Sequence, residues 1–73
     1  MERVPVESQT LKSVGYNEKT RVLELEFTSG DIYQYFNVFP GEHAGLLAAE
    51  SLGRYFQSNI RQRYAYRRIS SAP

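Results

Sequence analysis

Within residues 21–28, six consecutive side chains alternate between apolar and polar, and this alternation constrains the fold more than any other feature of the chain. The two sets are Leu23, Leu25 and Phe27 on one side and Glu24, Glu26 and Thr28 on the other. A period of two is typical of a β-strand that packs one face on a core and turns the other to water. The pattern therefore predicts a half-buried strand whose two glutamates lie on a solvated face.

Two further segments are expected to flank this strand. Residues 10–16 mix apolar and β-branched side chains, and residues 31–38 follow a Ser-Gly pair that favours a hairpin. Together with residues 21–28 they predict a three-stranded antiparallel meander.

The length of the hairpin loop decides which residues of the third strand join the leucine face. With a two- or four-residue loop, the residues on that face are Ile32, Gln34 and Phe36. With a three-residue loop and a left-handed Gly30, Tyr33 and Tyr35 join the leucines instead. A buried Gln34 would need a hydrogen-bond partner for its amide, so the three-residue loop is favoured.

Two short helices are predicted after the strands, over about 40–50 and 52–63. Pro40 suits a first helical turn, where its missing N–H costs nothing, and Ser51 is a good N-cap for the second helix. Arg63 falls near the apolar side of that helix, so it must snorkel, pair with an acid or lie beyond the helix end. The expected fold is α+β: a three-stranded antiparallel meander followed by two short helices packed on one face.

The length of 73 residues leaves room for one domain with one core. We expect residues 9–68 to form it, with 1–8 as a flexible lead-in and 69–73 as a frayed tail. The longest apolar run, residues 46–49, is far shorter than the roughly 20 residues that span a bilayer. These features predict a cytoplasmic protein with no membrane partner. A monomer is expected, with self-association as the open alternative.

The sequence carries no recognisable catalytic or metal site. The chain has no cysteine, and its single histidine, His43, cannot form a zinc site alone. No serine or carboxylate stands at the spacing of a catalytic triad, and Glu24 and Glu26 have no third ligand. We expect a protein without enzymatic activity, cofactor or metal.

Charge is divided unevenly along the chain. Residues 1–50 hold four basic and eight acidic residues, a net charge of −4, whereas residues 51–73 hold five arginines and no acid, a net charge of +5. Such a division can steer an anionic partner to the basic end. Alternatively, the basic end folds back on the acidic strands and neutralises them.

Arginine and tyrosine interleave in the basic part, which favours binding over catalysis. Guanidinium groups make bidentate phosphate contacts, and exposed tyrosine rings stack on bases, a combination suited to single-stranded or irregular RNA. The candidate phosphate contacts are Arg54, Arg61, Arg67 and Arg68, and the candidate stacking residues are Tyr64 and Tyr66, or Tyr33 and Tyr35. The alternative is a protein-interaction or self-association module that binds no nucleic acid. A purely structural role is also open, in which Tyr64 and Tyr66 pin the C-terminus.

An ordered set of short motifs across residues 8–68 resembles the KTSC domain. The motifs are Val14-Gly15-Tyr16, Leu23-Glu24-Leu25-Glu26-Phe27, Gly30, Tyr33-Gln34-Tyr35, Phe39-Pro40, Ala49-Glu50-Ser51-Leu52-Gly53-Arg54-Tyr55-Phe56, Ile60-Arg61 and Tyr64.

The resemblance implies a small domain that occurs alone in bacteria and at the C-terminus of some lysyl-tRNA synthetases. The YxY motif of the family corresponds to Tyr33 and Tyr35, and the synthetase association suggests RNA as a partner. The chain departs from the family at Gln57, where asparagine is usual, and at His43-Ala44, where bulkier residues are common.

Overall fold

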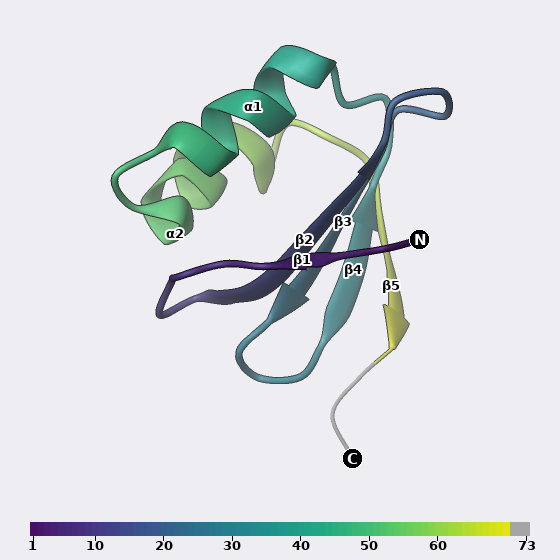
Figure 1. Ribbon diagram of the computed structural model, residues 1–73. Coiled ribbons are helices and arrows are strands. Elements are labelled where there is room, and N and C mark those ends of the chain that lie inside the picture. Colours follow the sequence, from purple (N-terminus) through teal and green to yellow (C-terminus); the bar gives the residue numbers. More distant parts are fainter. Residues whose placement is uncertain (71–73) are drawn as a thin grey trace.

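A five-stranded antiparallel sheet is the framework of the protein in a computed structural model that describes residues 1–70 (Figure 1). Its strands lie in the order of the sequence, so each strand pairs with its neighbours in the chain. They are β1 (Val4–Pro5), β2 (Leu11–Asn17), β3 (Val22–Phe27), β4 (Ile32–Tyr35) and β5 (Tyr66–Ser70).

The predicted α+β class is confirmed, but the prediction of three strands is wrong, because β1 and β5 extend the meander at its two edges. Strand β1 lies in the expected flexible lead-in, residues 1–8, where it pairs with β2. Strand β5 reaches Ser70, inside the expected frayed tail 69–73, of which residues 71–73 lie outside the described part. Neither strand has the alternation of a half-buried strand, because every residue of β1 and β5 is exposed.

The hairpin between β3 and β4 has the favoured three-residue loop. Gly30 has a φ of 100°, and its N–H donates to the Phe27 carbonyl over 2.9 Å. Glycine adopts this conformation at little cost, and the bulge sets the register. Tyr33 lies opposite Leu25 and Tyr35 opposite Leu23, so both tyrosines share the leucine face as predicted.

The helical part consists of α1 (Pro40–Ala48), α2 (Leu52–Tyr55) and a π-helical segment, η1 (Phe56–Ile60). Pro40 opens α1, and the Ser51 hydroxyl caps α2 by accepting the Arg54 N–H over 3.2 Å, both as predicted. The second helix was expected to continue to residue 63 but ends at Ile60, with one wide turn in its last half. Within the described residues, no helix is long and apolar enough to cross a membrane.

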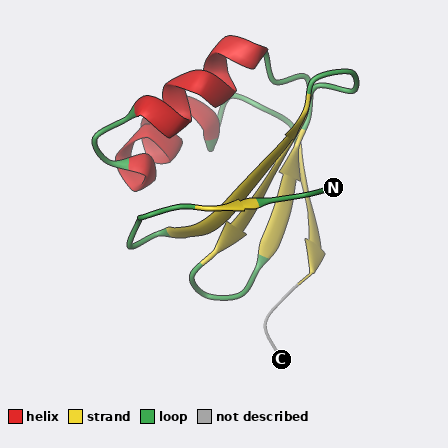
Figure 2. Cartoon of the chain, viewed as in Figure 1, coloured by secondary structure: helices red, strands yellow, loops and turns green. Residues whose placement is uncertain are grey.

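The helices cover one face of the sheet and close the core against it (Figure 2). The sheet and the loop that follows β4 contribute Leu11, Val14, Leu23, Leu25, Tyr35 and Val38. The helical part contributes Leu46, Leu52, Phe56 and Ile60.

On the opposite face of the sheet, Glu24 is not solvated, contrary to the expectation for the two glutamates. Glu24 is only 4% exposed, because the first residues of the chain lie over it and Arg3 pairs with its carboxylate. The absence of a side chain at Gly15 permits this approach, since a Cβ there would lie 2.7 Å from the Glu2 carbonyl oxygen. The alternation of β3 therefore separates a largely buried apolar face from a polar face on which Glu24 is buried and Glu26 is half-buried.

Candidate functional site

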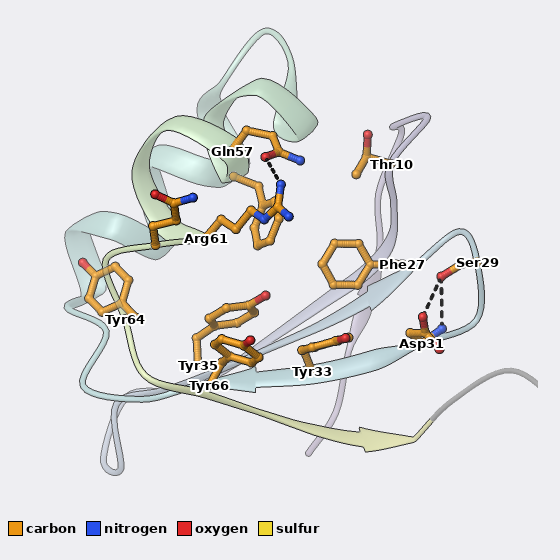
Figure 3. A pocket seen from close by; sticks show the side chains of 12 residues that line it. Thr10, Phe27, Ser29, Asp31, Tyr33, Tyr35, Gln57, Arg61, Tyr64 and Tyr66 are labelled. Carbon is orange, nitrogen blue, oxygen red and sulfur yellow. Dashed lines mark hydrogen bonds between the residues drawn. The ribbon is translucent and has the colours of Figure 1, made fainter.

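Three tyrosines of β4 and β5 form a cluster on the helix side of the sheet (Figure 3). Tyr35 and Tyr66 are directly opposite each other, and Tyr33 lies two residues before Tyr35 on the same face. Their ring centroids are 5.7 Å apart for Tyr33 and Tyr66, 5.8 Å for Tyr35 and Tyr66, and 6.3 Å for Tyr33 and Tyr35. We call Tyr33, Tyr35 and Tyr66 the tyrosine cluster.

The tyrosine cluster runs from the core to the surface. Tyr35 is 3% exposed, Tyr33 is half-buried, and Tyr66 is 60% exposed. Burial raises the pKa of Tyr35 to about 12, and the neighbouring Tyr33 and Tyr66 act in the same direction against the opposing charge of Arg61. Within the cluster, Tyr35 is therefore buried and Tyr66 is exposed to water.

A hollow of about 690 Å³ lies between the tyrosine cluster and η1 (Figure 3). Phe27 and Phe56 add apolar wall beside the cluster, with a T-shaped contact of 5.2 Å between their centroids. From the helical side, the Arg61 guanidinium donates to the Gln57 side-chain oxygen over 2.9 Å, and both residues line the hollow. The site therefore combines aromatic faces with one cation, Arg61, and one acid, Asp31.

The four arginines predicted to bind phosphate do not lie together. Arg61 lines the hollow, and Arg68 lies opposite Tyr33 in the sheet, which places it on the face of the tyrosine cluster. Arg67 lies opposite Gln34 and therefore belongs to the other face. Arg54 lines a second hollow, beside the connection between β1 and β2, so it does not form one surface with Arg61.

Tyr64, the other predicted stacking residue, also lines the hollow, but its hydroxyl is used within the fold. Its hydroxyl donates to Glu42 over 2.7 Å, and the Tyr55 hydroxyl donates to the other oxygen of the same carboxylate. Arg63 lies beyond the end of η1 and 3.9 Å from Glu42, which combines two of the three placements expected for it. Glu42 thus ties α1 to the segment that leads into β5.

Buried tyrosines make the fold sensitive to alkaline pH. Burial and the hydrogen bond to Glu42 raise the pKa of Tyr64 to about 12, the value that burial also gives Tyr35, against about 10 in an unfolded chain. A raised folded-state pKa contributes stability that is complete below pH 10 and is lost as the pH rises towards 12. We expect urea midpoints to stay level up to pH 9.5 and then fall, as followed by circular dichroism.

The replacement Tyr64→Phe is the matched control for this alkaline loss. It removes one titrating hydroxyl, so its midpoint should fall less steeply above pH 10 than that of the unchanged protein. Equal slopes would mean that the hydroxyl of Tyr64 ionises in the folded state as it does in water.

His43 has a structural place in the fold. Its ring stacks on Tyr16 with centroids 4.7 Å apart, and burial lowers its pKa. The Tyr16 hydroxyl in turn donates to the Val38 carbonyl. Across residues 1–70, no three metal-ligating side chains gather at one point.

The tyrosines of β4 were predicted from the sequence as candidate site residues. Phe27, Thr10 and Gln57, which also line the hollow, were not. Phe27 was identifiable, because it ends the apolar side of the alternating strand and faces the same way as the tyrosines in the favoured register. Thr10 and Gln57 come together only through the packing of η1 on the sheet, and no local pattern indicates this.

Comparisons with known proteins agree on one family. A family model described as the KTSC domain matches residues 7–64. A protein of Stutzerimonas stutzeri is 44% identical over 70 residues, which cover 94% of this chain and 99% of that protein. The crystal structure of a KTSC domain protein from Yersinia pestis matches with a TM-score of 0.92 at 35% identity, covering 94% of this chain and 97% of that one.

A longer relative contains a similar segment. A lysine–tRNA ligase of Nostoc punctiforme is 34% identical over 64 residues, which are 88% of this chain and 11% of the ligase.

Proposed function

The chain belongs to the KTSC domain family, and from this premise we propose that it is a small RNA-binding accessory module. Single-stranded RNA would stack on the tyrosine cluster, with Arg61 and Arg68 on its phosphates. The observation that carries the proposal is the contact of three tyrosine rings, one of them 60% exposed, on a face that also holds two arginines.

The chemistry of this face suits unpaired bases better than a duplex. A ring stacked on a base contributes about 1–3 kcal/mol and accepts every base, because each has a π face. Bases inside a duplex are stacked on each other and do not offer that face. Arginine adds a planar, permanently charged group that forms paired hydrogen bonds with phosphate.

The arginines of the basic part differ in their surroundings. This difference bears on whether acids of the protein neutralise that part or leave it open to an anionic partner. Arg63 lies 3.9 Å from Glu42, and Arg67 lies on the outer face opposite Gln34, so neither adds its charge to the tyrosine cluster. Arg61 and Arg68 accompany the tyrosine cluster, and the ion pairs among residues 1–70 involve neither of them. Their charge therefore remains available to an anionic partner.

The name of one relative supports RNA as the partner. The ligase of Nostoc punctiforme, which contains a segment similar to this chain, is named as an enzyme that joins lysine to tRNA. The similar segment is 11% of that protein, so the proposal takes from it an RNA partner and not the ligase reaction.

The proposal predicts salt-sensitive RNA binding that depends on two of the arginines. We expect a short single-stranded RNA and a tRNA to shift the NMR signals of Tyr66, Arg61 and Arg68, with affinity falling as salt rises. Each neutralised single-strand phosphate contributes about 0.7 to the slope of log affinity against log salt. The double replacement Arg61→Gln and Arg68→Gln should therefore lower the slope by about 1.4.

The matched control is Arg54→Gln, which removes the same charge from the second hollow and should leave the slope almost unchanged. Affinity that does not respond to salt, or shifts that avoid the tyrosine cluster, would overturn the proposal. Light scattering of the free protein accompanies the titration, and we expect a monomer.

The free edge of β5 favours a second candidate, the addition of an extended protein segment to the sheet. Among the described strands, only β4 pairs with β5, and all five of its residues are exposed. Two copies paired antiparallel about Arg68 would place arginines close to each other, which disfavours self-association. An acidic segment of another protein fits this edge better.

A further inference from the structure

Tyr35 is a buried residue whose hydroxyl has no hydrogen-bond partner among residues 1–70. The residue is 3% exposed. Buried tyrosine hydroxyls nearly always have a partner. No polar side-chain atom of the described residues is both sealed from the surface and unpaired, so this hydroxyl must open on the hollow that Tyr35 lines.

The hollow around this hydroxyl has the dimensions and walls of a small-molecule site. Its volume of about 690 Å³ lies within the roughly 300–1,000 Å³ typical of ligand pockets. Tyr33, Tyr66 and Phe27 supply ring faces on the sheet side, and Arg61 enters from η1 (Figure 3). Gln57 holds the Arg61 guanidinium in place through one hydrogen bond, which leaves its other N–H groups for a ligand.

A ligand that matches these groups must have three properties. It must present a flat face to the aromatic rings, carry an acceptor for the Tyr35 hydroxyl, and bear an anionic group for Arg61. The raised pKa of Tyr35 keeps its hydroxyl protonated throughout the neutral range, so it acts as a donor. A purely apolar ligand would leave that donor unsatisfied, and a free phosphate would leave the aromatic walls bare.

We infer that the hollow binds one unpaired nucleotide of an RNA strand, with its base among the rings of Phe27, Tyr33 and Tyr66. A carbonyl oxygen or ring nitrogen of the base accepts from the Tyr35 hydroxyl, and the nucleotide's phosphate lies against Arg61. This inference rests on the proposed function, because it concerns the same face of the sheet. It adds that one base enters the hollow while its neighbours in the strand remain on the surface.

The test uses single nucleotides and a sugar phosphate that lacks the base. We expect uridine and adenosine 5′-monophosphates to shift the NMR signals of Phe27, Tyr33 and Tyr66, and ribose 5-phosphate to leave them in place. Tyr35→Phe should weaken nucleotide binding about fivefold, which corresponds to one hydrogen bond of about 1 kcal/mol. The control is Tyr55→Phe, which removes the same atom outside the hollow and should leave nucleotide affinity unchanged.

The outcomes separate this inference from the proposed function. Ribose 5-phosphate shifting the ring signals as strongly as the nucleotides would make the hollow a phosphate site and overturn the inference. An RNA strand that binds with the expected salt slope, unaffected by Tyr35→Phe, would also overturn it but would leave the proposed function standing. If neither RNA nor nucleotides bind to a folded protein, both proposals fail.

Discussion

Glu24→Ala is expected to lower the free energy of unfolding by about 3 kcal/mol. This loss is large for a residue whose place in the alternating sequence of β3 is typical of a side chain that faces water. The carboxylate is 4% exposed and pairs with the Arg3 guanidinium. Its other oxygen accepts from the Gln34 side-chain amide over 2.9 Å. Alanine would leave a partly buried cation and a partly buried amide without their acceptor. Urea unfolding monitored by tyrosine fluorescence measures the loss.

Two variants decide whether the loss comes from these contacts. Glu7→Ala removes an exposed glutamate and should change stability by less than about 0.5 kcal/mol. Arg3→Ala combined with Glu24→Ala should cost less than the sum of the single changes, because the two residues interact directly. A loss below about 0.5 kcal/mol for Glu24→Ala would mean that the pair behaves as a surface ion pair.

Glu42→Ala is expected to cost about 2 kcal/mol, since it removes the acceptor of two tyrosine hydroxyls at once. The Glu42 side chain is 12% exposed and receives hydrogen bonds from Tyr55 and Tyr64, with Arg63 at 3.9 Å. The same change should lower the pKa of Tyr64, because the bond to Glu42 helps to raise it. Urea unfolding gives the first effect, and the ultraviolet absorbance of tyrosinate gives the second.

Single-hydroxyl variants are the controls for Glu42. Tyr55→Phe and Tyr64→Phe each remove one donor and leave the carboxylate with the other, so each should cost less than Glu42→Ala. Adding Glu42→Ala to the double phenylalanine variant should then cost little. A full-sized further loss in that background would show that Glu42 acts through something other than these two hydroxyls.

The middle of the sheet was predictable because its signals are local. The alternation of residues 21–28 and the loop with Gly30 fix the register of β3 and β4, and with it the side on which Tyr33 and Tyr35 lie. The edges were not predictable in this way. Strands β1 and β5 are held by pairing with β2 and β4, and neither carries an alternating pattern that reports such a contact.

The polar face shows why alternation alone cannot tell water from a buried polar layer. Glu24 and Glu26 have the spacing of a solvated face, yet Glu24 is covered and Glu26 accepts from the Ser13 hydroxyl over 2.7 Å. The covering residues lie about twenty positions earlier in the chain. Gly15 was the available clue, since a residue without a side chain on a strand admits another stretch of backbone.

The sequence indicated which residue types form the candidate site, but not where in the fold they come together. The sequence indicated arginines and tyrosines, but the fold places them apart. The Tyr64 hydroxyl bonds to Glu42, Arg67 lies on the outer face, and Arg54 lines another hollow. The partnership of Tyr66 with Tyr33 and Tyr35 depends on β5 returning to β4 after both helices. No sequence period spans that distance.

The return of β5 has a consequence for when the site exists. Strands β2 to β4 close through short turns, whereas β5 joins β4 only after residues 36–65 have folded over the sheet. Contacts between distant parts of a chain form late, because the intervening loop must first be ordered. One wall of the hollow comes from β5 and another from η1, so a partly folded chain presents no hollow. A ligand held there binds only the finished molecule, and its concentration therefore adds to the stability of the whole domain.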